Sequence, residues 1–190
     1  MADTNTTPFS DVYDSFLSKI TDDMYMELTE DDTYKMLEDL LISSIPKFEF
    51  PRVSLFDYVR GSTKQVEHTT IDEETGEEIS TITNEYTVGY FNVQLTMEEI
   101  NILATYMIVE WLGQQLASVE NTRMKYSGTD FKFTSQANHM QKLLVIKKDY
   151  EREGFHLQRL YKRRKLDDNG GPKSTLAQIV APLGRKGGHK

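Results

Sequence analysis

Residues 95–118 read LTMEEINILATYMIVEWLGQQLAS, and this stretch decides the fold class that we expect. Thr96 and Glu99 have the spacing of a capping box, which predicts where a helix begins. Met97 and Val109 widen the apolar surface beyond a single stripe. We therefore expect a central core helix contacted from several sides. Its apolar residues recur three and four positions apart, as on one helix face: Ile100, Leu103, Ala104, Met107, Ile108, Trp111, Leu112 and Leu116.

Gly113 interrupts this helix, at a cost of about 1 kcal/mol relative to alanine. Two explanations are open for it. Either a neighbouring element approaches closely at this point, which we favour, or the helix kinks there.

Two shorter helices are predicted before the central one. Pro8 begins the first, which runs to about Ile20 with Phe9, Val12, Tyr13, Phe16, Leu17 and Ile20 on one face. Residues 21–28 are predicted to form a linker with a short extended piece. Thr29 begins the second helix, with acids in its first turn, and Pro46 and Pro51 end it. Its predicted buried face holds Tyr34, Leu37, Leu40, Leu41 and Ile45. The segment that follows, residues 48–58, is aromatic and extended, and we predict that it fills the core.

A β-hairpin is predicted for Lys64–Val93, around a turn at residues 73–77 in which Gly76 supplies a positive φ. The side chains near its tip are mostly polar on both faces, and a two-stranded ribbon is barely stable alone. We therefore expect the ribbon to project and to pair with another chain or line a cavity.

After a predicted loop at residues 119–134, a long last helix is expected from about Ser135 to Lys165. Its predicted buried side holds Met140, Leu143, Leu144, Tyr150, Leu157, Leu160 and Tyr161, with Lys147 and Gly154 as interruptions. Residues 168–172, DNGGP, end this helix. The expected fold is thus mainly α, a small bundle of about four helices in residues 1–168 with the hairpin inserted at 64–93, followed by a flexible C-terminal arm at 169–190.

The charge is divided unevenly along the chain. The net charge is −8, yet residues 159–190 carry nine Lys and Arg against two Asp, and residues 1–158 carry 13 positive and 28 negative charges. An acidic body is not suited to wrapping nucleic acid, whereas the basic end suits an acidic partner, including a second copy. The chain has no cysteine, no apolar run of about 18 residues and a polar start, so neither disulfides nor a membrane span are expected.

No catalytic or metal-binding constellation is recognisable, so we predict no enzyme activity, no metal and no cofactor. The four histidines, His68, His139, His156 and His189, are too far apart in sequence for ligands on one helix. Adjacent carboxylates occur at helix starts and turns, where acids are common. The glycines form no phosphate-binding loop.

One basic cluster allows two interpretations: Arg159, Lys162, Arg163, Arg164 and Lys165. It has the charge to contact phosphates as a secondary role. The preferred interpretation is a helix C-terminus that pairs with acidic neighbours.

The order of parts resembles the head-to-tail connector proteins of tailed bacteriophages, also called adaptor or head-completion proteins. A second helix ends in LLISSIPKFEFPR, a thin hairpin follows with the turn DEETGEE, and FNVQLTMEEINILATYMIVEWL begins the apolar helix. The resemblance covers roughly Pro8 to Lys165 and lies in arrangement, without a diagnostic motif. It implies a homo-oligomeric ring of twelve copies in the virion neck, assembled in the host cytoplasm, that contacts the portal protein on one side and a tail or stopper protein on the other.

Within such a ring, two groups of residues receive expected roles. DNA would pass through the lumen without sequence recognition, beside a channel-lining hairpin tip: Asp72, Glu73, Glu74, Glu77 and Glu78. The apolar and basic residues of the arm would bind the portal: Leu176, Ile179, Val180, Leu183, Arg185 and Lys186.

Two alternatives remain open. The first is a non-enzymatic acidic regulatory protein, a monomer or dimer that occupies the site of a nucleic-acid-binding partner. The second is another collar position, such as a tail terminator or stopper, although such rings are β-rich.

Overall fold

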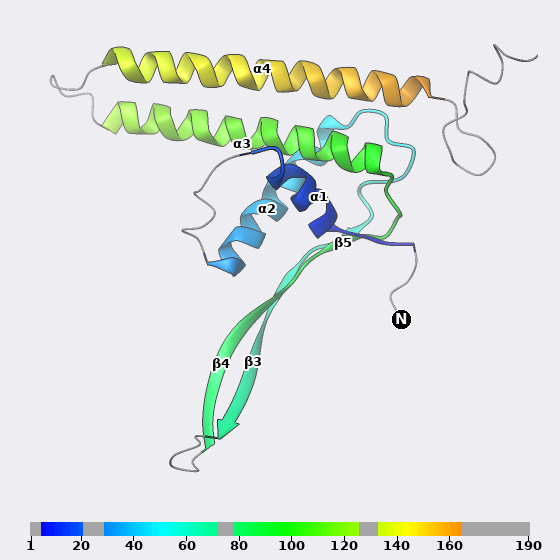
Figure 1. Cartoon of the computed structure of the whole chain (residues 1–190), viewed down its shortest axis with the longest axis vertical. Helices are drawn as coiled ribbons and strands as arrows, with labels where there is room; N and C mark the ends of the chain where they lie inside the picture. The colour runs from blue at the N-terminus through cyan, green and yellow to red at the C-terminus, as the bar shows by residue number, and fades with distance from the viewer. Residues whose placement is uncertain (1–4, 21–28, 72–77, 126–132, 165–190) are drawn as a thin grey trace, which may run out of the picture.

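The computed structural model describes residues 5–20, 29–71, 78–125 and 133–164, and its fold is mainly α with an inserted hairpin, as predicted. Two long antiparallel helices, α3 (Met97–Lys125) and α4 (Phe133–Arg163), lie side by side (Figure 1). On the other side of α3 lie α1 (Phe9–Leu17) and α2 (Glu30–Ser44), which continues into the 3-10 turn η2 (Ile45–Lys47). The linker predicted at residues 21–28 lies outside the described residues.

The capping box at the start of α3 is confirmed. The Thr96 backbone N–H donates to Glu99 Oε2 over 2.8 Å, and the Glu99 N–H donates to Thr96 Oγ1 over 3.3 Å. Every residue from Ile102 to Val109 is buried, so the helix is covered around its whole circumference, as expected. Trp111 and Leu116 are only half-buried.

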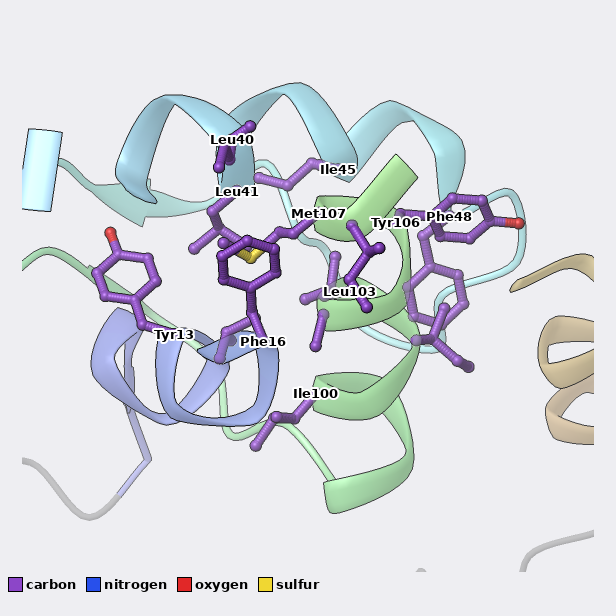
Figure 2. Close-up of a cluster of buried hydrophobic side chains, with 14 of the residues drawn as sticks. Tyr13, Phe16, Leu40, Leu41, Ile45, Phe48, Ile100, Leu103, Tyr106 and Met107 are labelled. Atoms are coloured by element: carbon purple, nitrogen blue, oxygen red, sulfur yellow. The ribbon is translucent and has the colours of Figure 1, made fainter. Parts of the chain in front are cut away.

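The core lies where α1, α2 and α3 meet. Phe16 of α1, Leu41 of α2 and Met107 of α3 point toward one another in Figure 2, and all three are fully buried. Each such side chain contributes roughly 1.5–3 kcal/mol by its removal from water. The predicted faces of the two N-terminal helices are confirmed, with Tyr34, Leu17 and Ile20 half-buried at the edge.

The boundaries of the two long helices were predicted wrongly. The helix α3 continues to Lys125, through the first part of the predicted loop, and α4 begins two residues before Ser135. Beyond Ser118 the apolar period weakens, and among the described elements only α4 runs beside α3 there (Figure 1). The polar residues of this segment are still compatible with a helix, and Val119 remains half-buried between exposed neighbours.

The buried side of α4 is narrower than predicted. Leu144 and Leu160, both assigned to the core, are 44% and 38% exposed. Met140, Leu143, Tyr150 and Leu157 are half-buried, and Tyr161 is fully buried. Over most of its length, α4 packs on one described element, α3, so its contact stripe is narrow and apolar side chains beside that stripe stay exposed.

The strands form two separate sheets, whereas a single ribbon at 64–93 was predicted. A long two-stranded ribbon pairs β3 (Ser62–Ile71) with β4 (Glu78–Thr87). A small sheet pairs β5 (Tyr90–Phe91) with β1 (Thr7–Pro8) on one side and β2 (Tyr58–Val59) on the other. No periodic pattern in the sequence marks these two-residue strands, because they are too short to show one.

The ribbon projects away from the helical body, as expected (Figure 1). Ten residues per strand correspond to roughly 34 Å. Cross-strand partners such as Lys64 and Glu85, or Gln65 and Asn84, place polar residues on both faces. Ile82 is 67% exposed, so the ribbon has no core of its own among the described residues.

The aromatic segment between α2 and the ribbon fills the core only in part. Phe48 and Leu55 are buried, as predicted. In contrast, Phe50 is 38% and Phe56 71% exposed, so the prediction of core filler is wrong for these two side chains.

The close approach predicted at Gly113 occurs at Gly154 instead. A Cβ atom at Gly113 would meet only Lys147 Cε, at an ordinary 3.6 Å. A Cβ atom at Gly154 would lie 2.8 Å from the Tyr106 ring, nearer than atoms tolerate. The helices α3 and α4 therefore need a glycine at residue 154, where the Tyr106 ring lies against the α4 backbone.

We expect these two glycines to respond oppositely to alanine. Gly113→Ala should raise the free energy of unfolding by about 1 kcal/mol through helix propensity. Gly154→Ala should lower it by about 1–3 kcal/mol, because the Tyr106 ring must move. Urea unfolding followed by circular dichroism measures both, and equal effects would contradict the assignment of the contact to Gly154.

Candidate functional site

The base of the projecting ribbon is organised by one buried carboxylate, Glu38 of α2, which is 3% exposed. Its Oε2 accepts hydrogen bonds from the Gly61 backbone N–H over 2.7 Å and from the Tyr86 hydroxyl over 2.9 Å. Its Oε1 accepts from Arg60 Nε over 2.5 Å. One side chain thus binds the beginning of β3 and the end of β4 together, so it ties the ribbon to α2.

Stacking and close packing reinforce this anchor. The Tyr86 ring lies parallel to that of Tyr34, with centroids 5.2 Å apart and an interplanar angle of 8°. Burial, and after it the hydrogen bond to Glu38, raise the pKa of Tyr86, so its hydroxyl remains a donor. A Cβ atom at Gly61 would lie 2.1 Å from the Tyr86 oxygen, so only glycine fits beneath the tyrosine.

Sequence analysis missed this anchor, although one signal was present. Glu38 lies four residues after Tyr34 and three before Leu41, which places an acid on the apolar face of α2. A buried acid needs donors. Its donors come from residues 60, 61 and 86, however, and the sequence does not show that these meet.

Removal of this carboxylate should loosen the ribbon. Glu38→Ala leaves the half-buried Gly61 N–H and Tyr86 hydroxyl without their acceptor and removes a buried carboxylate, so we expect a loss of about 2–4 kcal/mol in unfolding free energy. The neighbouring Asp39 also binds Arg60, over 2.9 Å, but its side chain is 69% exposed. Asp39→Ala should therefore cost less than about 0.5 kcal/mol.

Urea unfolding measures both variants, and amide hydrogen exchange of β3 and β4 reports the ribbon directly. Glu38→Ala should accelerate exchange in both strands, whereas Asp39→Ala should not. If the two variants were equally stable, the anchor would not depend on Glu38.

One of the predicted channel-lining acids, Glu78, lies at the far end of this ribbon. Glu78 is the first residue of β4 and pairs with Ile71, the last of β3. Asp72, Glu73, Glu74 and Glu77 lie outside the described residues. The register thus places the Ile71–Glu78 pair at the end of the ribbon farthest from the helical body (Figure 1).

The basic end of α4 has mixed surroundings. Arg164 pairs with Glu98 of α3 over 3.3 Å, as the preferred interpretation expected. Lys162 lies over the Phe50 ring, 3.9 Å from its centroid, and Arg159 lies 6.0 Å from the Phe155 ring. Arg163 is exposed, and Lys165 lies outside the described residues. Only part of this cluster therefore pairs with acids.

A residue that sequence analysis did not single out, Arg52, caps the same helix end. Its guanidinium lies 4.0 Å from the Tyr161 ring centroid and donates to the carbonyl oxygens of Tyr161 and Arg164, over 2.6 and 2.8 Å. The Tyr161 hydroxyl donates to Glu99 Oε1 and accepts from the Arg52 backbone N–H over 3.1 Å. Glu99 therefore caps the start of α3 with one oxygen and holds the end of α4 with the other.

On the opposite side of α3, a groove of about 360 Å³ lies between α1 and α2. Leu17, Tyr34 and Leu37 supply apolar lining, and Asp14 and Glu30 supply acidic lining. Tyr13 also lines it, and the buried Tyr13 hydroxyl has no hydrogen-bond partner among the described residues. We name this feature the acidic groove. Its full lining is Ser10, Tyr13, Asp14, Leu17, Glu30, Thr33, Tyr34 and Leu37.

The described residues hold no group of three His, Asp or Glu arranged to bind a metal ion. Within the same residues, no helix is long and apolar enough to cross a membrane. The candidate portal-binding residues, Leu176 to Lys186, lie outside the described part of the chain.

Comparison with protein-family models, with curated proteins and with solved structures finds no match for this chain.

Proposed function

We propose that this chain is a structural subunit of the ring that joins the head and the tail of a tailed bacteriophage. Copies of the chain surround the channel beneath the portal, extend it, and present the surface to which a tail or stopper protein attaches. The chain carries out no catalysis in this role. DNA passes through the lumen without sequence recognition.

The observation that carries this proposal is the anchored, projecting ribbon. The ribbon extends roughly 34 Å from the body with polar residues on both faces, and each strand has an outer edge that no other described strand covers. A ribbon of this kind gains little from its own subunit. In a ring, neighbouring ribbons lie side by side, so their edges and polar faces meet other ribbons or a water-filled channel.

The rigid base supports the same role. Three hydrogen bonds to Glu38 and the stacked Tyr34–Tyr86 pair hold the ribbon to α2. A fixed ribbon direction lets every copy present its ribbon identically, as a closed ring requires. The acidic tip then repels the DNA phosphates rather than binding them, which suits passage through a channel.

Native mass spectrometry and negative-stain microscopy of the full chain test this proposal, alone and with portal-bearing heads. We expect rings of about twelve copies, the number that the family resemblance implies. A monomer or dimer under both conditions would contradict the proposal and favour the acidic regulatory protein.

A shortened ribbon gives a sharper test. Residues 67–82 are replaced by Asn-Gly, which keeps the anchor residues Gly61 and Tyr86. The helical body should stay folded, with an unchanged circular dichroism melting temperature, because the described part of the deleted segment belongs to the ribbon that projects away from the body (Figure 1). Ring closure should be lost. Normal rings from the shortened chain would show that the ribbon has no part in assembly.

The C-terminal arm provides a separate test of portal binding. Leu176, Ile179, Val180 and Leu183 are apolar and lie between basic residues, so burial in a groove of the portal contributes roughly 6 kcal/mol before ordering costs. Deletion of residues 173–190 should leave the melting temperature unchanged and abolish attachment to portal-bearing heads. If attachment persists, the docking surface lies on the helical body.

A further inference from the structure

The outer flank of α4 carries an apolar and basic surface that the core does not use. Phe155 is 48% and Leu144 44% exposed, although both are large apolar residues. Basic residues stand between and beside them at helical spacing: Lys148, Arg152 and Arg159. We name these five residues the α4 face. Such a combination is typical of an interaction surface, in which an aromatic anchor is surrounded by polar residues.

The charges of the α4 face are available for a partner. Among the described residues, Arg152 pairs only with Asp149 of its own helix, over 3.2 Å, in an exposed contact worth little. Glu151, the acid beside Phe155, already pairs with Lys147 over 2.5 Å. A shallow depression lined by Lys148, Glu151, Arg152 and Phe155 marks the centre of this face.

The acidic groove has the complementary character. Its lining combines apolar Leu17 and Leu37 with acidic Asp14 and Glu30, and a further exposed acid, Asp11, lies close by on α1. Cavities of roughly 150 Å³ accept benzene. The groove, at about 360 Å³, therefore has room for a phenylalanine ring.

The two surfaces lie on opposite sides of the molecule. The helix α4 covers one side of α3, whereas α1 and α2 cover the other (Figure 1). A contact between them cannot form within one subunit and joins one copy to the next. Repetition of such a head-to-tail contact gives a ring when the rotation closes.

We propose that the α4 face of one copy docks on the acidic groove of the next copy, with Phe155 inserted between α1 and α2. Arg152 and Arg159 then approach Asp14 and Glu30. This inference rests on the proposed ring function and names the lateral contact of that ring.

Charge also disfavours the competing contacts. Two α4 faces would bring bases against bases, and two acidic grooves would bring acids against acids. Both would give symmetric dimers that cannot grow. Only the head-to-tail pairing brings opposite charges together, so the same residues that attract the neighbour also exclude the dimer.

The first test compares two substitutions on α4. Phe155→Glu removes the anchor and should abolish assembly at concentrations where the unaltered chain is fully assembled. Leu160→Glu is the matched control, since Leu160 is also exposed but lies about 140° around the helix from Phe155. The control should assemble normally. Circular dichroism verifies that both variants are folded.

The second test reverses charges on the full chain. Arg152→Glu with Arg159→Glu, or Asp14→Lys with Glu30→Lys, should each prevent assembly in native mass spectrometry and sedimentation. The variant with all four substitutions restores opposite charges at every contact and should assemble again. Recovery in the fourfold variant distinguishes a direct contact from damage to the fold.

The outcomes separate this inference from the proposed function. If the unaltered chain forms rings that none of these substitutions disturbs, the ring stands and the lateral contact is wrong. If the chain forms open polymers that the substitutions abolish and the fourfold variant restores, the contact stands and the ring is wrong. A chain that remains monomeric with and without portal-bearing heads overturns both.

Discussion

The fold depends on the need to cover α3 on every side. From Ile102 to Val109 no residue of this helix is left exposed, so a single neighbour could not remove its surface from water. The helices α1 and α2 cover one side and α4 covers the other. This three-layer arrangement leaves two different outer surfaces, one formed by α1 and α2 and one by α4. A subunit with unlike opposite surfaces can associate head to tail.

Two buried glutamates connect this helical body to its other parts. Glu99 caps α3 and accepts from Tyr161, so the start of one long helix is bonded to the end of the other. Glu38 binds the two strands of the ribbon to α2. In both cases a carboxylate is retained in the interior because several donors converge on it, which offsets the cost of burial. The geometry of the ribbon relative to the helices is therefore defined by the hydrogen bonds to Glu38 together with the stacked Tyr34–Tyr86 pair.

The proposed role uses these features together. The ribbon has a rigid base but a polar length, so its stability in the assembly comes from neighbouring copies. The exposed apolar residues of α4 are similarly incomplete in the single subunit, because side chains such as Phe155 and Leu144 remain in water. Opposite charges on the α4 face and the acidic groove select a head-to-tail neighbour. Lateral contact and channel lining would then be separate functions of separate surfaces.

The sequence by itself determined the helices, the central position of α3, its capping box and the existence of a polar hairpin. These features depend on residues three, four or two positions apart, and such local patterns are visible in the chain. The helix ends at Lys125 and Phe133 were predicted wrongly. Where a helix is covered on a single side, the apolar period of its sequence weakens although the segment remains helical.

Only the tertiary structure decided which distant residues meet. The need for glycine at residue 154 rather than 113 depends on where the Tyr106 ring lies. The donors to Glu38 come from more than 20 residues away, and Arg52 reaches Tyr161 across 109 positions. The acidic groove and the exposure of Phe155 likewise follow from how the helices pack. Periodicity shows that a side chain lies on a face, but contact between two faces depends on the packing of the whole chain.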